Sequence, residues 1–263
     1  MKRHLWFAVK SGIVLAGLIL IWHVAVLKLK VPPYMLPGPG AVAEAMVHRF
    51  HALVNSLWLT TEAAAIGLIS SIVVGVAVAL MFAQWRWLRQ LFFPYTILLQ
   101  TVPIVAISPL IIMWVGAGVY SVAVIAFIIC LAPIIANTTQ GLISVDENLI
   151  HLFLMHKATP TQILFRLRLP HAMPNLFVGI RISSGIAVTG AIVGELFAGS
   201  SRVGEGGLGY SITYASNQLE TDYLFALVVA ASVLGFAFFF ATMFLEWYFL
   251  HNWHESRRSE LPE

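Results

Sequence analysis

Long apolar segments separated by short polar ones dominate the chain. Six of them are long enough to cross roughly 30 Å of hydrocarbon as helices that rise about 1.5 Å per residue. They cover residues 9–28, 57–83, 91–115, 119–142, 176–199 and 223–250. A β-barrel would show short segments of alternating hydropathy, whereas these runs are continuous. The pattern predicts an all-α integral membrane protein with six transmembrane helices, organised as one domain over residues 1–263.

The main polar interruption lies at residues 143–175, between the fourth and fifth apolar segments. Ser144 and Glu147 have the spacing of a capping box, with Ser144 as the N-cap, and they predict a helix over residues 145–156. An ordered helical insert between two membrane spans is suited to docking another protein. We therefore interpret this insert as the part of the chain that meets a partner.

A second capping box follows at Thr159 and Gln162, with Pro160 at the first helical position. This helix is expected to end before Pro170, because the residue that precedes a proline disfavours helical geometry. The insert is thus predicted to be two short helices joined at a tight corner near residues 157–159.

The third apolar segment is interrupted by Pro94, Pro103 and Pro109. Each interior proline removes a backbone donor, and a freed carbonyl is costly in lipid unless it faces protein or water. Gln100 lies between the first two prolines and offers a polar side chain. We expect a broken helix in which Gln100 and Pro103 line a pathway, although a simple packing kink would also explain the prolines.

Basic residues predict the orientation of the chain. The positive-inside rule places loops rich in Lys and Arg in the cytoplasm. With the N-terminus inside, the cytoplasmic positions are Lys2, Arg3, Lys10, Arg86, Arg89, Lys157, Arg166, Arg168, Arg257 and Arg258, and the outer ones are Lys28, Lys30, Arg49 and Arg202. This bias predicts a cytoplasmic insert and two cytoplasmic termini.

Composition agrees with a membrane protein and excludes several classes of function. The chain is 59% hydrophobic and only 10% charged, whereas soluble domains are about a quarter charged. The net charge of +3 requires no nucleic-acid partner. The single cysteine, Cys130, precludes an intrachain disulfide. No histidine spacing of a metal site and no Walker A sequence occurs, so we expect no metal, no bound cofactor and no enzymatic activity in this chain.

The insert resembles the EAA loop of the membrane subunits of bacterial ABC importers. Ala158, Thr159, Leu167, Leu169 and Pro170 match the family pattern of small residues followed by an x-Leu-Pro ending. The family's glycine falls at Lys157, and its EAA tripeptide is replaced by apolar residues around Phe153.

The resemblance extends along nearly the whole chain. LPGPGAV, ISPLIIMWVGAG, IIANTTQGLISVD and GELFAGSSRVGEGGLGYSI are similar to motifs of the nitrate/sulfonate/taurine-type permeases. A narrower likeness, carried by TTEAAAIG, LLQTVPIVAISPL and NQLETDYLFALVV, is to permeases for thiamine-precursor pyrimidines or riboflavin. The resemblance implies a type I ABC importer permease-like fold in the bacterial inner membrane.

The resemblance also implies partners and roles. The insert would seat in a cytoplasmic ABC ATPase dimer that binds ATP and Mg, an extracytoplasmic solute-binding protein would deliver the solute, and a second permease copy, as a homodimer, would complete the pathway. The residues implied for ATPase coupling are Phe153, Lys157, Ala158, Thr159, Pro160, Leu164, Leu169 and Pro170. Gly206, Gly207 and Gly209 would form an outer gate or receptor contact.

Polar residues within the apolar segments are further pathway candidates. Glu62, Asn137 and Glu195 are expected to face protein or water, because polar groups in lipid are costly. The solute could be a pyrimidine or riboflavin-like compound, or a small anion such as nitrate, sulfonate or taurine. An alternative class is a stand-alone secondary transporter, but no second segment matches the proline-rich one, as inverted repeats would require.

Overall fold

The computed structural model describes residues 2–198 and 206–251, and every regular element in this part of the chain is a helix. The helices are α1 (Lys2–Leu29), α2 (Pro39–His48), α3 (Phe50–Gln84), α4 (Arg86–Thr101), α5 (Ile104–Val115), α6 (Val119–Ile143), α7 (Glu147–Met155), α8 (Pro160–Ile163), the π-helical turn η1 (Leu164–Arg168), α9 (Leu169–Ala198), α10 (Leu208–Asn217) and α11 (Thr221–Leu250). The all-α prediction is therefore confirmed.

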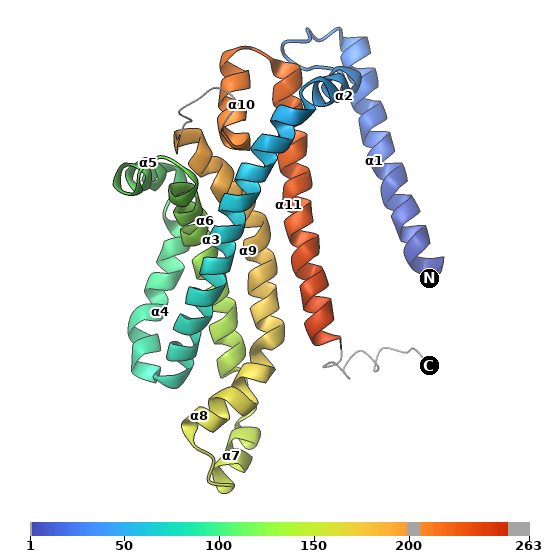
Figure 1. Ribbon diagram of the computed structural model, residues 1–263. Helices are drawn as coiled ribbons and strands as arrows, with labels where there is room; N and C mark the ends of the chain where they lie inside the picture. The colour runs from blue at the N-terminus through green and yellow to red at the C-terminus, as the bar shows by residue number, and fades with distance from the viewer. Residues whose placement is uncertain (1, 199–205, 252–263) are drawn as a thin grey trace.

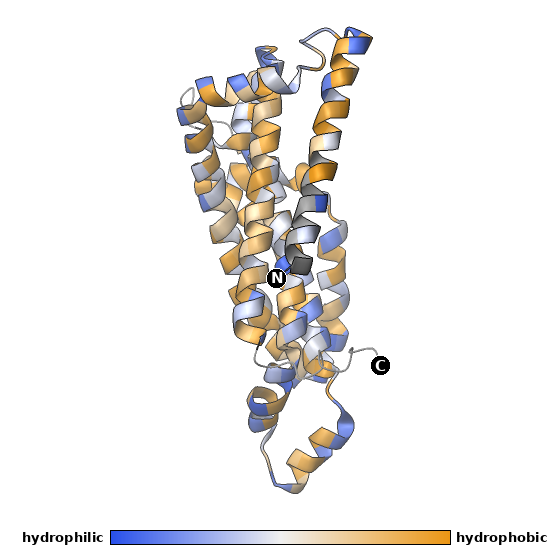
Figure 2. Cartoon of the chain, turned by 90° about the vertical axis from the view of Figure 1, so that its right-hand side faces the viewer, coloured by the Kyte–Doolittle hydropathy of each residue, from blue (hydrophilic) through white to orange (hydrophobic). Residues whose placement is uncertain are grey.

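Four helical stretches are long and apolar enough to cross a membrane: Phe50–Gln84, Val119–Ile143, Pro160–Ala198 and Thr221–Leu250. The pair α4 and α5 counts as a fifth span if the two form one broken segment. Within α1, Ala16–Leu29 is a shorter apolar helix. Hydrophobic residues line the long helices, and hydrophilic ones gather toward the two ends of the bundle (Figure 2). The described helices thus give four or five spans, and the predicted sixth stays a prediction.

The core of the bundle lies where α6 packs between α3 and α9. Small residues allow the backbones to approach closely, as is common between membrane helices. A Cβ atom on Gly67 would lie 2.6 Å from Cβ of Ala126, so only glycine fits there. Hydroxyls add hydrogen bonds between the helices: Ser71 Oγ donates to the Phe127 carbonyl at 2.8 Å, and Ser183 Oγ donates to the Cys130 carbonyl at 3.0 Å.

The third predicted span, residues 91–115, is broken rather than kinked. Helices α4 and α5 meet at an angle of 99° across Val102 and Pro103. Pro94 and Pro109 lie inside α4 and α5 and do not end them. The break falls at Pro103 because Val102 takes the extended geometry that a residue before proline prefers.

Two charged residues within the spans pair with each other. The Nη1 atom of Arg181 on α9 lies 3.5 Å from a carboxylate oxygen of Glu246 on α11. Each of the two charges therefore has a partner of opposite sign between α9 and α11. Arg257, which the pattern of basic residues places in the cytoplasm, lies outside the described residues.

The insert lies at one end of the molecule, and the loops next to α2 and α10 lie at the other (Figure 1). Helices α7 and α8 project beyond the bundle at one end, and α2 and α10 lie at the other. Helix α1 runs apart from the bundle in this view. In its C-terminal half, Trp22 stacks on Phe225 of α11 with ring centroids 6.1 Å apart. This arrangement separates a candidate partner-binding end from a candidate solute-entry end.

Candidate functional site: the helical insert and the outer polar network

The first helix of the insert, α7, begins and ends with well-formed caps. Its N-cap is Asp146, whose carboxylate accepts a hydrogen bond from the Asn148 N–H at 2.8 Å. The prediction of Ser144 as N-cap is wrong, because Ser144 instead ends α6, where its N–H donates to the Gln140 carbonyl. The helix covers Glu147–Met155, slightly less than the predicted 145–156.

The corner after α7 is a Schellman motif centred on Lys157. The Lys157 N–H donates to the Leu154 carbonyl at 2.9 Å, and the Ala158 N–H donates to the Phe153 carbonyl at 3.0 Å. Lys157 has a φ of 56°, in the left-handed region that favours glycine. The position at which the family has glycine therefore needs that geometry, and here a lysine adopts it.

Substitution of Lys157 tests whether the corner requires a positive φ at this residue. Lys157→Ile should destabilise the insert by roughly 1 kcal/mol, because a β-branched residue tolerates positive φ poorly. Chymotrypsin should then cleave the insert about fivefold faster, since cleavage follows local opening. Lys157→Gly should be cleaved no faster than the parent chain. Equal cleavage of the Ile variant and the parent would contradict the assignment.

The second helix begins as predicted. Thr159 Oγ1 accepts from the Gln162 N–H at 3.3 Å, and the Gln162 side chain accepts from the Thr159 N–H at 2.8 Å. The predicted end before Pro170 is wrong, because the helix continues through η1 into α9. In the π-helical turn the Leu169 N–H donates to the Leu164 carbonyl, and this change of register accommodates a proline that has no donor.

The insert exposes an unusual amount of apolar surface. Helix α7 has no buried residue, and Leu149, Leu152, Leu154, Met155 and Phe165 are all exposed. Phe165 lies on η1, after the corner, so the exposed apolar side chains come from both the segment before the corner and the segment after it. Exposed apolar patches of this kind are typical of protein–protein or membrane interaction sites.

The predicted coupling residues divide into two groups. Lys157, Thr159 and Pro160 are exposed at the corner, and Phe153 and Ala158 are half-buried there. Leu169 and Pro170 are half-buried where the insert joins α9. Leu164 is buried at 6% exposure against Ala79, Ala83, Leu142 and Ala172, so it anchors the base of the insert and offers no surface for docking.

The five predicted pathway residues are not brought together by any hydrogen bond or ion pair among the described residues. Glu62 on α3, Gln100 at the end of α4 and Pro103 at the break are exposed. Asn137 donates to the Pro133 carbonyl at 2.8 Å and packs against Gly179 of α9. Asn137 therefore serves helix packing in this structure, whereas Glu62, Gln100 and Pro103 remain on the surface.

Glu195 is buried at 6% exposure in a network at the end of the bundle opposite the insert. Its carboxylate accepts from Thr60 Oγ1 at 3.0 Å and from the Gly209 N–H at 2.8 Å. Thr60 Oγ1 in turn accepts from the Leu208 N–H at 2.8 Å. Glu195 and Thr60 thus each accept from one of the free N–H groups at the start of α10, where a negative charge is also favourable. Arg202, which the pattern of basic residues places on the outer side, lies outside the described residues.

The glycines of the predicted outer gate are required by close approach. A Cβ atom on Gly207 would overlap the Glu195 carboxylate, and one on Gly209 would overlap the Ile192 carbonyl. Neither glycine has a positive φ, so a backbone conformation that favours glycine is not the reason for them. Gly204 and Glu205 of the same run lie outside the described residues.

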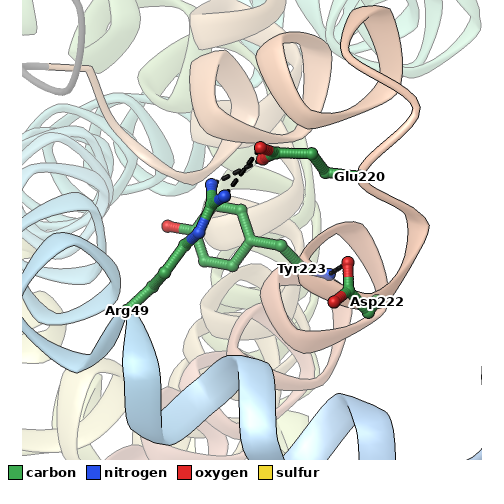
Figure 3. Close-up of polar contacts among 4 residues, drawn as sticks. All are labelled: Arg49, Glu220, Asp222 and Tyr223. Atoms are coloured by element: carbon green, nitrogen blue, oxygen red, sulfur yellow. Dashed lines mark hydrogen bonds and ion pairs between the residues drawn. The ribbon is translucent and has the colours of Figure 1, made fainter.

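A second contact at this end of the bundle, which the sequence did not reveal, ties the corner between α2 and α3 to the segment that joins α10 and α11 (Figure 3). Arg49 donates two hydrogen bonds to Glu220, one of them at 2.6 Å, and its guanidinium lies 4.7 Å from the centre of the Tyr223 ring. The bond to Glu220 raises the pKa of Arg49 above its usual value. A Schellman motif at the end of α10, with Leu219 at a φ of 57°, places Glu220 there.

Comparison with known proteins gives a consistent result. Residues 71–258 match the family described as binding-protein-dependent transport system inner membrane component. The riboflavin transport system permease protein of Chloroflexus aurantiacus is 32% identical over 94% of this chain and 91% of its own length. The formylaminopyrimidine transport permease protein of Halalkalibacterium halodurans is 29% identical over 94% of this chain and 96% of its own length.

A solved structure shares the fold. The MetNI methionine ABC transporter in an inward-facing conformation matches with a TM-score of 0.58 and 21% identity, over 74% of this chain and 96% of the matched chain. The family match covers most of the chain and includes the whole insert. The chain therefore belongs to the family of inner-membrane components of binding-protein-dependent transport systems, and it is the permease subunit of an ABC importer.

Proposed function

We propose that the insert formed by α7 and α8 is the element through which this permease is driven by a cytoplasmic ATPase dimer. The observation that carries the proposal is the exposed apolar surface of the insert, presented on two well-capped helices beyond the bundle. ATP and Mg would bind to the ATPase subunits. Their closure on ATP would move the insert and switch the side of the membrane to which the pathway opens.

The coupling contacts in this proposal are the corner residues Phe153, Lys157, Ala158, Thr159 and Pro160. They lie on the exposed or half-exposed part of the insert. Leu164, Leu169 and Pro170 belong to its base and transmit the movement rather than contact the ATPase. With the insert in the cytoplasm of a bacterial cell, both termini lie there too, and α1 supplies a sixth span.

A second copy of the chain completes the pathway, as a homodimer, at the surface of α4 and α5. Gln100 and Thr101 are exposed at the break, and Pro103 has no N–H with which to satisfy a carbonyl of the preceding turn. Such a surface is unfavourable against lipid and is tolerated where it faces protein or water. Glu62 and Gln100 are then candidates to meet solute within the assembly.

A binding protein would deliver the solute at the outer end, near α10 and its glycines Gly206, Gly207 and Gly209. Our preferred solute is a pyrimidine or riboflavin-like compound. The support is the length of the match to two relatives, one named for riboflavin and one for formylaminopyrimidine, each over 94% of this chain. A small anion such as nitrate, sulfonate or taurine is the alternative.

The first test is purification of the tagged chain from its native membrane in mild detergent. We expect an ABC ATPase to co-purify in equal numbers with the permease. In proteoliposomes with the binding protein, ATP should drive uptake of riboflavin or formylaminopyrimidine and not of taurine. Recovery of the chain alone, with uptake driven by an ion gradient, would overturn the proposed coupling.

A further inference from the structure

Arg168 joins the insert to a membrane helix by a hydrogen bond to the backbone. It is the last residue of the π-helical turn η1, and its Nη1 atom donates to the Ala83 carbonyl at 2.8 Å. Ala83 lies in the last turn of α3, where the carbonyls have no donor within the helix. The Trp85 N–H donates to the Met81 carbonyl, and the Arg168 side chain provides the donor for the Ala83 carbonyl. A cation is also favourable at a helix C-terminus.

Among the described residues, the other contacts that η1 itself makes at this junction are apolar, and the Ser144–His171 contact at 3.5 Å lies between α6 and α9. Leu164 packs with Ala79 and Ala83 of α3, Leu142 of α6 and Ala172 of α9. Apolar contact is not directional, so such surfaces tolerate sliding, whereas a hydrogen bond fixes direction and register. Among the described residues, no carboxylate pairs with Arg168, and the charge that acts on it is the like charge of Arg89 on α4. The junction therefore has one directional tie from η1 to α3.

The environment of Arg168 is costly for a residue that serves stability alone. Its Nε atom is buried and has no hydrogen-bond partner. A buried donor without a partner loses hydration and gains nothing in return. An apolar side chain of similar length would fill the same space at lower cost. The hydrogen bond to the Ala83 carbonyl thus offsets the unfavourable burial of Arg168 Nε. This balance favours a role of Arg168 in positioning the insert.

We propose that Arg168 is the positioning residue that fixes the insert to the corner between α3 and α4. Movement of α7 and α8 then reaches the corner through the Ala83 carbonyl. The corner is short, because α3 ends at Gln84 and α4 begins at Arg86, so it carries the movement into α4 and the break at Pro103. This inference rests on the proposed docking of the ATPase to the insert.

The test uses the complex of permease, ATPase and binding protein in proteoliposomes. A fluorophore is attached to a Trp87→Cys substitution, which is exposed at the start of α4, and buried Cys130 does not compete for the label. Addition of Mg-ATP should shift the signal in the parent complex. Arg168→Met should reduce this shift roughly fivefold or more, while ATPase binding and the melting temperature of the permease stay at the parent values.

Matched variants distinguish a positioning role of Arg168 from a contribution to the folding of the permease. Arg166→Met removes the same side chain from an exposed position on the same turn and should leave the shift unchanged. Arg168→Lys keeps a donor long enough to approach the carbonyl and should retain most of the shift. If Arg168→Met does not assemble, Arg168→Gln takes its place, because its amide ends short of the carbonyl.

The outcomes are distinct. A parent-like shift in Arg168→Met or Arg168→Gln overturns the role of Arg168 and leaves the proposed docking intact. Failure of the ATPase to bind the parent chain overturns the proposed docking and this inference with it. A loss of signal in Arg166→Met equal to that in Arg168→Met also overturns the inference, because it would show a general sensitivity to charge.

Discussion

Replacing Ala158 with glutamate is expected to abolish ATP-driven uptake while leaving the membrane helices folded. Ala158 is half-buried at the corner between α7 and α8, and it follows Lys157 in the Schellman motif. In the proposed complex this corner seats in the ATPase. A carboxylate without a partner in such an interface costs about 3 kcal/mol or more, which weakens association roughly a hundredfold.

The measurement is uptake by proteoliposomes together with the amount of ATPase that co-purifies with the permease. Ala158→Ser keeps the small size of the side chain and should behave like the parent chain. Ala41→Glu places the same charge at an exposed position of α2, at the opposite end of the molecule, and should retain the ATPase. Normal co-purification and uptake with Ala158→Glu would contradict docking at the corner.

Features set by neighbours in the sequence were predictable. The capping box of Thr159 and Gln162 is present as expected because all its donors and acceptors lie within three residues. The break at Pro103 likewise follows from the chemistry of proline. Ser144 shows the limit of such reasoning. Both Ser144 and Asp146 are good N-cap residues, and the choice of Asp146 depends on where α6 ends.

Features set by distant neighbours were not predictable. Glu195 was recognisable as a carboxylate in an apolar segment, but its partner Thr60 lies 135 positions away on α3. The tie from Arg168 to Ala83 spans 85 positions, and the pair Arg49 and Glu220 spans 171. One sequence contains no information on such pairs beyond the cost of an isolated charge. Helix packing decides which charges meet and which remain on the surface.

The network around Glu195 leads to the second large effect: Gly209→Ala should destabilise the permease. A Cβ atom at this position would overlap the Ile192 carbonyl of α9 and lie 2.8 Å from Cβ of Glu195. Backbone has to move, and the Gly209 N–H then loses its 2.8 Å bond to the Glu195 carboxylate. Overpacking of this kind costs roughly 2 kcal/mol, which corresponds to a drop of about 4 °C or more in melting temperature.

Gly235→Ala is the matched control, because a Cβ atom on Gly235 of α11 meets nothing within 4 Å. Alanine is favoured over glycine inside a helix by roughly 0.5–1 kcal/mol, so this variant should melt at or above the parent temperature. Equal melting temperatures for Gly209→Ala and the parent would mean that α10 moves away from α9 at little cost. The glycine would then permit motion rather than close packing, and Glu195 would be free to leave the network and face the pathway.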